Sequence, residues 1–369
     1  MSAVAASSQR HTSSCVPVTD GDPAEGFFET RHTIDMVLEG GRRYAFNAYS
    51  THLNNMDLLA ENPVLVFIHG GGFSCLSWAS VCKYCAGFNF PVLALDLYGH
   101  GASGSLSDAS SEVDFSVERY KRDVVHVLNQ LLPEEFLATG RASVLPRVVL
   151  VGHSMGGAVA AHVANVPCPA AGASVKGGAL ALNADVCGLV VIDVVEGTAL
   201  EALRGMEVVL QQMPTDFCDE AEAIDWVTNN YMRSPNNPNP GKVAVPPMLC
   251  LNKRTKRYEW RTNLFKTIPF WKGWYEGMSG LFLSPRKKYK KMLVVAGMDR
   301  LDTPLTIAHM QGKFQYVNLP NFGHIMHEED PFLFSNLLKK FVQTQGLSRM
   351  GARAMQEKLT QSWLAKADD

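Results

Sequence analysis

A serine stands between two glycines in the stretch Gly152-His153-Ser154-Met155-Gly156. An apolar run over residues 148–151 precedes it, and small residues that suit a helix follow it. Gly-x-Ser-x-Gly between a buried strand and a helix is typical of a nucleophile elbow, which lifts the serine hydroxyl above a sheet. The pattern predicts acyl transfer through Ser154, with the backbone N–H of Met155 as one donor to the developing oxyanion.

A serine becomes a good nucleophile only when a base takes its proton, and His324 is the best candidate among eleven histidines. It comes shortly after the apolar, strand-like run over residues 314–319. His327 lies near it in the chain and could be mistaken for the base. His153 is expected to point away from the face of the elbow that carries the serine.

The acid that orients the base has two candidates. Asp193 ends the apolar run 188–192, and Asp299 follows the apolar run 292–296. Either choice gives the chain order serine, acid, histidine that is found in α/β-hydrolases. The spacing favours neither residue, and Arg300 beside Asp299 could hold that carboxylate in an ion pair instead.

The loop His69-Gly70-Gly71-Gly72 follows the apolar run 64–68 and predicts the second half of an oxyanion hole. Glycines let backbone N–H groups approach an oxygen closely. We expect the N–H of Gly71 to be the second donor, with Gly72 as the alternative. A phosphate-binding role is disfavoured because the Lys-Ser/Thr pair of a phosphate loop is absent here.

The arrangement of apolar segments predicts an α/β fold. Continuous apolar runs at 64–68, 92–97, 188–192 and 292–296 read as buried strands, and residues 114–132 have helical spacing. Such runs indicate a mostly parallel sheet that helices cover on both faces. Because ligands bind at the carboxyl ends of such strands, the candidate residues above are expected to meet at one edge.

The remaining segments give the expected domain organisation. Residues 1–25 are predicted to be disordered, and residues 26–343 to form one hydrolase domain. A helical lid is expected as an insertion at about 196–285, where predicted strands and helices no longer alternate and aromatic residues are frequent. A loop or loose insertion is expected at 166–187, and a tail at 344–369 that is either an amphipathic helix or a loose segment.

Composition excludes several classes of protein. The 369 residues are 46% hydrophobic with a net charge of −2, which points neither to nucleic acid nor to a membrane surface. No apolar run is long enough for a transmembrane helix, and the N-terminus lacks the apolar core of a signal peptide, so a cytoplasmic or nuclear protein is expected. We also expect a monomer.

Cys82 and Cys85 have no second ligand pair, which favours free thiols over a metal site. The basic clusters 253–257 and 286–291 read as solvated loops, with an import signal or a docking site for an acidic partner as alternatives.

Several longer runs resemble the protein phosphatase methylesterases, a family of α/β-hydrolases. They include Ile192-Asp193-Val194-Val195-Glu196-Gly197-Thr198-Ala199, Met310-Gln311-Gly312-Lys313-Phe314-Gln315 and the region Trp271-Lys272-Gly273-Trp274. The resemblance covers roughly residues 60–343. It departs from the family in a longer segment at 165–187 and in a lid that is basic rather than acidic.

The resemblance implies Ser154 as nucleophile, His324 as base and Asp193, rather than Asp299, as acid. It implies hydrolysis of the methyl ester on the C-terminal leucine of the protein phosphatase 2A catalytic subunit, through an acyl-enzyme and without a cofactor. The lid suggests that the triad aligns only when the phosphatase docks. The alternative is a general carboxylesterase or lipase-like hydrolase of small esters, and a non-catalytic binding protein is a third possibility.

Overall fold

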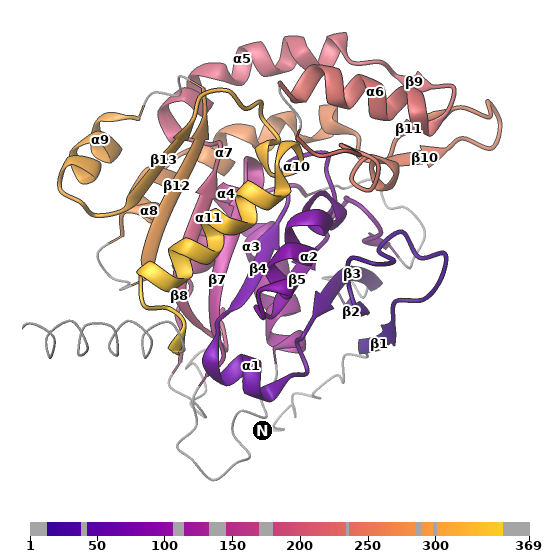
Figure 1. Ribbon diagram of the computed structural model, residues 1–369. Coiled ribbons are helices and arrows are strands. Elements are labelled where there is room, and N and C mark those ends of the chain that lie inside the picture. The colour runs from indigo at the N-terminus through magenta and orange to yellow at the C-terminus, as the bar shows by residue number, and fades with distance from the viewer. Residues whose placement is uncertain are drawn as a thin grey trace, which may run out of the picture.

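A twisted sheet runs through the centre of the molecule, with helices on both faces (Figure 1). The computed structural model describes residues 13–37, 43–105, 114–132, 145–169, 180–233, 236–284, 289–297 and 301–349. Within these ranges the sheet has ten strands in the order β1-β2-β3-β5-β4-β7-β8-β12-β13, with β6 paired to β3. The pairs from β5 to β13 are parallel, and those among β1, β2, β3 and β5 are antiparallel. The α/β-hydrolase architecture predicted from the sequence is therefore confirmed.

The strands of the central sheet are bounded as follows: β1 Ser13–Pro17, β2 Thr30–Val37, β3 Arg43–Thr51, β4 Val64–Ile68, β5 Val92–Leu95, β6 Gly104–Ser105, β7 Arg147–His153, β8 Asp185–Ile192, β12 Lys290–Ala296 and β13 Gln315–Leu319. The α-helices are α1 Met56–Glu61, α2 Ala79–Gly87, α3 Val117–Leu131, α4 Met155–Ala164, α5 Glu196–Gln212, α6 Glu220–Tyr231, α7 Trp271–Tyr275, α8 Met278–Phe282, α9 Thr303–Met310, α10 Met326–Glu329 and α11 Pro331–Thr344.

Strand β7 shows why the central strands are apolar throughout. Val148 and Leu150 face the core that α3 and α4 cover, whereas Val149 and Val151 face the core beneath α2 and α11. All four side chains are fully buried, so neither face of the strand can be polar. The sheet thereby holds the carboxyl ends of β4, β7, β8 and β12 side by side in a rigid frame.

Residues 13–25 differ from the disorder predicted for residues 1–25. Strand β1 pairs with β2 in antiparallel register, and Ala24 is completely buried beneath the sheet. A strand at the edge of a sheet needs only backbone hydrogen bonds to its neighbour. Strand β1 can therefore be polar, and the sequence shows no apolar pattern that would predict it.

The segment predicted as a helical lid is only partly helical. Its outer portion holds α5, α6 and a small antiparallel sheet, in which β11 Tyr258–Trp260 pairs with both β10 Leu249–Leu251 and β9 Asp216–Phe217 (Figure 1). Helices α7 and α8 belong instead to the main core, because Trp271, Trp274 and Phe282 are buried there. Their aromatic residues suggested a lid because the sequence alone does not show which layer they pack into.

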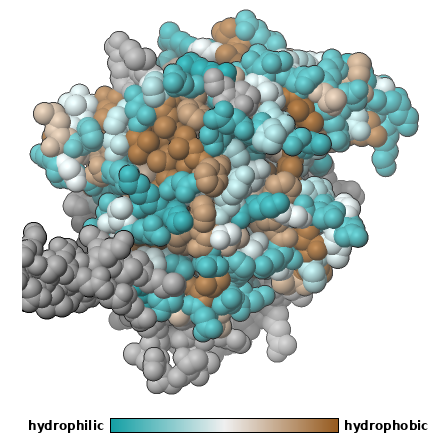
Figure 2. All heavy atoms as spheres, in the orientation of Figure 1, coloured by the Kyte–Doolittle hydropathy of each residue, from teal (hydrophilic) through white to brown (hydrophobic). Residues whose placement is uncertain are grey.

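Some predictions fall outside the described residues: the first twelve residues of the N-terminal segment, the middle of the 166–187 insertion, residues 286–288 of a basic cluster, Asp299, and the tail beyond residue 349. Among the helices that are described, none combines the length and apolarity that a membrane crossing requires. The face in Figure 2 is mostly polar, with an apolar patch above the upper ends of β12 and β13.

The elbow generates a stability prediction at Gly156. A Cβ atom there would collide with the carbonyl oxygens of Ile68 and His69, which belong to backbone that cannot move aside cheaply. We expect Gly156→Ala to lower the free energy of unfolding by about 1–3 kcal/mol, measured by urea denaturation. Gly87→Ala is the matched control, since a Cβ at Gly87 meets no atom within 4 Å. Equal stability of the two variants would contradict the predicted close packing.

A second prediction concerns His327, which stacks on Trp78 with ring centroids 4.0 Å apart. Neither of its ring nitrogens has a hydrogen-bond partner within the described ranges, and burial, with a smaller effect from His324, lowers the pKa of His327 to about 3. The unfolded chain takes up this proton below about pH 6.5 and the folded chain does not, so stability is lost as the pH falls below 6.5.

We expect His327 to cost about 1 kcal/mol of stability between pH 7.5 and 5.5. His327→Phe keeps an aromatic ring on Trp78 and removes the titrating group. Urea unfolding should show the stability of the wild type falling relative to this variant by that amount over the interval. A difference between the two proteins that does not change with pH would refute the argument.

Candidate active site

Ser154 occupies the sharp turn between β7 and α4. Its φ and ψ are 52° and −123°, a conformation that residues other than glycine rarely adopt. The backbone N–H of Ser154 donates to the carbonyl of Ile192 at 2.8 Å, so the neighbouring strand holds the turn in place. Strain of this kind persists only where the surroundings enforce it, and it commonly marks a functional residue.

Asp193 lies at the end of β8 and meets His324. Its Oδ2 atom is 2.6 Å from Nδ1 of His324, and its Oδ1 atom accepts the N–H of Ala296 at 2.7 Å. The backbone N–H of Asp193 donates to Val294 at 2.8 Å. Two contacts with β12 therefore fix the carboxylate over the end of the next strand, which is also the strand that Asp299 follows. With φ of 51°, Asp193 is, like Ser154, one of the few described non-glycine residues with positive φ.

His153 lies beneath the loop that carries His324. Its Nε2 is 2.8 Å from the carbonyl oxygen of His324, so this nitrogen carries the proton and donates it. Burial, followed by the nearby His324 and His327, holds the pKa of His153 well below its usual value. The ring is thus a neutral support for the backbone at His324 and is turned away from the cavity.

The glycine loop predicted as an oxyanion site is held rigidly by His69. The Nε2 atom of His69 accepts the N–H of Leu97 at 3.0 Å, and its Nδ1 donates to the carbonyl of Gly70 at 2.7 Å. Gly72 has φ of 82°, which explains a glycine at that position. Gly71 and Met155, the two predicted donors, both line the same cavity as Ser154.

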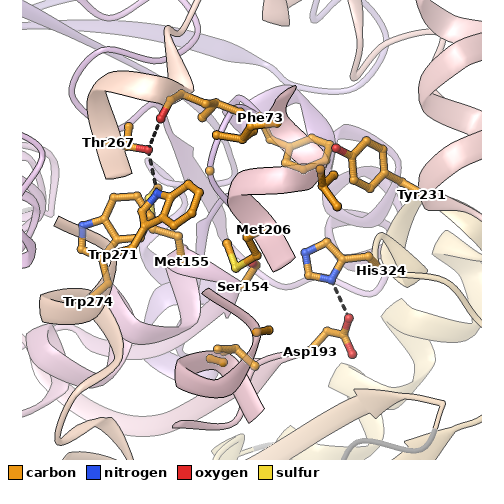
Figure 3. Close-up of a pocket in the computed structure, with 18 of the residues that line it drawn as sticks. Phe73, Ser154, Met155, Asp193, Met206, Tyr231, Thr267, Trp271, Trp274 and His324 are labelled. Atoms are coloured by element: carbon orange, nitrogen blue, oxygen red, sulfur yellow. Dashed lines mark hydrogen bonds and ion pairs between the residues drawn. The ribbon is translucent and has the colours of Figure 1, made fainter. Parts of the chain in front are cut away.

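This cavity has a volume of about 610 Å³ and lies between the carboxyl edge of the sheet and the lid (Figure 3). In this view His324 and Asp193 lie to one side of Ser154, and Trp271 and Trp274 lie to the other. The rest of its wall is mostly apolar and comes largely from α5 and the lid sheet: Ala199, Ala202, Met206, Leu210, Met213 and Trp260. An apolar cavity with a few convergent polar groups is the usual form of a small-ligand site.

Tyr275 is the site residue that sequence reasoning did not single out. It lines the cavity, is 3% exposed, and hydrogen-bonds with the side chain of Ser154. Burial raises the pKa of Tyr275 to about 12, and the bond with Ser154 opposes part of that rise. Among the described residues, the side chain of His324 is hydrogen-bonded to Asp193 and not to Ser154. No local pattern distinguishes Tyr275 from the other aromatic residues around it.

No cluster of three or more histidine, cysteine, aspartate or glutamate side chains within the described ranges could hold a metal ion. The cavity presents the side chains of Ser154, His324, Asp193 and Tyr275, and residues of the two loops line it as well.

Solved structures of hydrolases share the fold. A thioesterase domain from the curacin biosynthetic pathway matches with a TM-score of 0.53 and 20% identity over 83% of this chain and 98% of its own. A putative hydrolase from Rickettsia typhi matches with a TM-score of 0.54 and 11% identity, over 89% and 99% of the two chains. At these identities the likeness concerns the fold alone.

Sequence comparisons are more specific. The model of the alpha/beta hydrolase family matches residues 65–336. The protein phosphatase methylesterase 1 of Schizosaccharomyces pombe is 36% identical over 76% of this chain and 74% of its own, and that of Homo sapiens is 32% identical over 84% and 81%. A probable protein phosphatase methylesterase 1 from Caenorhabditis elegans is 38% identical over 73% of this chain, which spans 66% of that relative. The chain therefore belongs to the protein phosphatase methylesterase family of α/β-hydrolases.

Proposed function

We propose that this protein is a serine carboxylesterase that removes the methyl ester from the C-terminal leucine of the protein phosphatase 2A catalytic subunit. The observation that carries the chemistry is the 2.6 Å contact between His324 and Asp193 at the wall of a cavity that Ser154 also lines. The membership of the chain in the methylesterase family supports the substrate.

The first half of the reaction forms an acyl-enzyme. Asp193 holds the proton of His324 on Nδ1, which leaves Nε2 free to accept the proton of Ser154. The serine oxygen attacks the ester carbonyl, and the N–H groups of Gly71 and Met155 stabilise the oxyanion of the tetrahedral intermediate. The C–O bond to the methoxy group then breaks, and His324 returns the proton to it, so that methanol leaves.

The second half releases the carboxylate. A water molecule gives a proton to His324 and attacks the acyl carbon, and the intermediate collapses with proton return to Ser154. Asp193 keeps its charge throughout and stabilises the imidazolium that forms in each half. All of these steps use groups of the chain itself and water.

The cavity and the lid suit a protein substrate with an apolar chain end. Met206, Leu210 and Trp271 offer apolar contact for a leucine side chain near Ser154. Val208 and Phe265 on the outer surface of the lid region are 50% and 53% exposed, and residues 253–256 of the basic cluster are exposed at the turn between β10 and β11. Exposed apolar and charged side chains around a cavity are common where another protein docks.

The substrate is tested with the methylated phosphatase 2A catalytic subunit and, in parallel, a short-chain aryl ester. We expect release of methanol from the phosphatase by the wild type and none by Ser154→Ala, because Ser154 carries the attacking oxygen in the proposed reaction. Serine-directed fluorophosphonate should label the wild type and not the variant. Turnover of the aryl ester without turnover of the phosphatase would favour the general carboxylesterase.

The acid is tested with Asp193→Asn. Asparagine can keep the hydrogen bond from Ala296 through its oxygen but presents an NH₂ group to Nδ1 of His324, which forces the wrong imidazole tautomer. We expect kcat for the aryl ester to fall by about 10⁴, with the folded structure retained by circular dichroism. Asp299→Asn is the matched control and should keep nearly normal kcat. The reverse result would assign the acid to Asp299.

A further inference from the structure

A segment of the lid lies directly on the loop that carries His324. We call this segment, residues 231–233 and 236–241, the strap. The backbone N–H groups of Asn236 and Asn237 donate to the carbonyl of Glu329 at 2.7 and 2.9 Å, and the side-chain amide of Asn237 donates to the carbonyl of Glu328 at 3.1 Å. The strap is thereby fixed to α10, which follows His324 in the chain.

The side chain of Glu329 joins the strap to the His324 loop from within. It is completely buried, and its two oxygens face opposite elements. Oε1 accepts the N–H of Gly323 at 2.5 Å, and Oε2 accepts the N–H of Arg233 at 3.1 Å. Hydrogen bonds between a buried carboxylate and backbone amides are among the strong ones, so this carboxylate links the lid to the peptide that precedes His324.

Gly323 shows how closely the two segments approach. A Cβ atom there would collide with the carbonyl oxygen of Tyr231, and it would lie 2.8 Å from Oε1 of Glu329 and 3.0 Å from Cα of Met232. The ring of Tyr231 also packs edge-on against Phe73, which directly follows the glycine loop, with centroids 6.3 Å apart. The same end of the lid therefore touches both the base loop and the oxyanion loop (Figure 3).

We propose that Glu329 is a positioning residue for this reaction. Its carboxylate holds the loop so that the His324 ring reaches Asp193, and it makes that alignment depend on the position of the strap. The inference rests on the roles proposed above for Ser154, Asp193 and His324. It implies that a displacement of the strap is transmitted to the His324 loop through the Glu329 side chain, in addition to the backbone contacts described above.

The test is Glu329→Gln, which keeps the volume but turns an NH₂ group toward one of the two amide donors. We expect kcat for the aryl ester to fall about 10- to 100-fold while KM stays within about twofold, because the base is displaced and the cavity is not. The proton NMR resonance of the His324 Nδ1–H should also shift or broaden. A role limited to global stability would leave kcat and this resonance unchanged in the folded variant.

Glu328→Gln is the matched control. Glu328 is the adjacent residue, is 2% exposed, and its side chain accepts the N–H of Gly241 in the same strap at 3.1 Å. Among the described contacts, the side chain of Glu328 makes no hydrogen bond with the His324 loop, and only its backbone N–H donates to Ile325. Burial raises the pKa of Glu328 to about 7, so a neutral glutamine is a small change there. We expect kcat within about twofold of the wild type. An equal loss of kcat in both variants would overturn the proposal.

A second variant separates the inference from folding effects. Gly323→Ala must push the strap away from the base loop, and it should reproduce the loss of kcat even with Glu329 intact. If Glu329→Gln does not fold, normal kcat in folded Gly323→Ala overturns the inference. Normal kcat in folded Glu329→Gln overturns it directly. If His324→Ala keeps wild-type activity, or the wild type turns over no ester, the proposed function itself fails, which is a different outcome.

Discussion

The candidate site depends above all on the carboxylate of Asp193, which makes two contacts at once. One oxygen is held by the N–H of Ala296 at the end of β12, and the other faces His324. The parallel pairing of β8 with β12 brings these groups into register, and the positive φ of Asp193 turns the side chain across the strand end. The sheet, the most rigid part of the molecule, therefore fixes the position of the His324 ring, while the lid closes the cavity around it.

The parts of this protein that the sequence predicts well are those determined by local pattern. Val148 to Val151 are apolar without interruption because both faces of β7 are covered, so the strand is visible in the sequence. The elbow at Ser154 and the glycine loop after β4 are visible for a similar reason, since a sharp turn and a close backbone approach restrict the residue types. The order of these segments was enough to predict the fold class and the edge of the sheet at which the candidate residues gather.

The remaining features depend on contacts between residues far apart in the chain. Spacing could not choose between Asp193 and Asp299, because both follow strands that end at the same edge. The β strands of the lid are only two or three residues long, too short for a periodic pattern, and β1 is recruited at an edge by backbone pairing. Tyr275 and Glu329 acquire their contacts from partners about 100 residues away, which no local motif records.

Helix α5 contributes much to the wall of the cavity and little to the buried core. Only Leu210 of its seventeen residues is buried, yet Ala199, Ala202 and Gly205 form much of the roof of the cavity. The helix is fastened at its start, where the carboxylate of Glu196 accepts the N–H groups of Gly277 and Ser279. A Cβ at Gly205 would meet no atom within 4 Å, so larger side chains can reshape this roof without disturbing the sheet. The shape of the cavity can therefore evolve on one helix, largely independently of both the stability of the domain and the candidate catalytic residues.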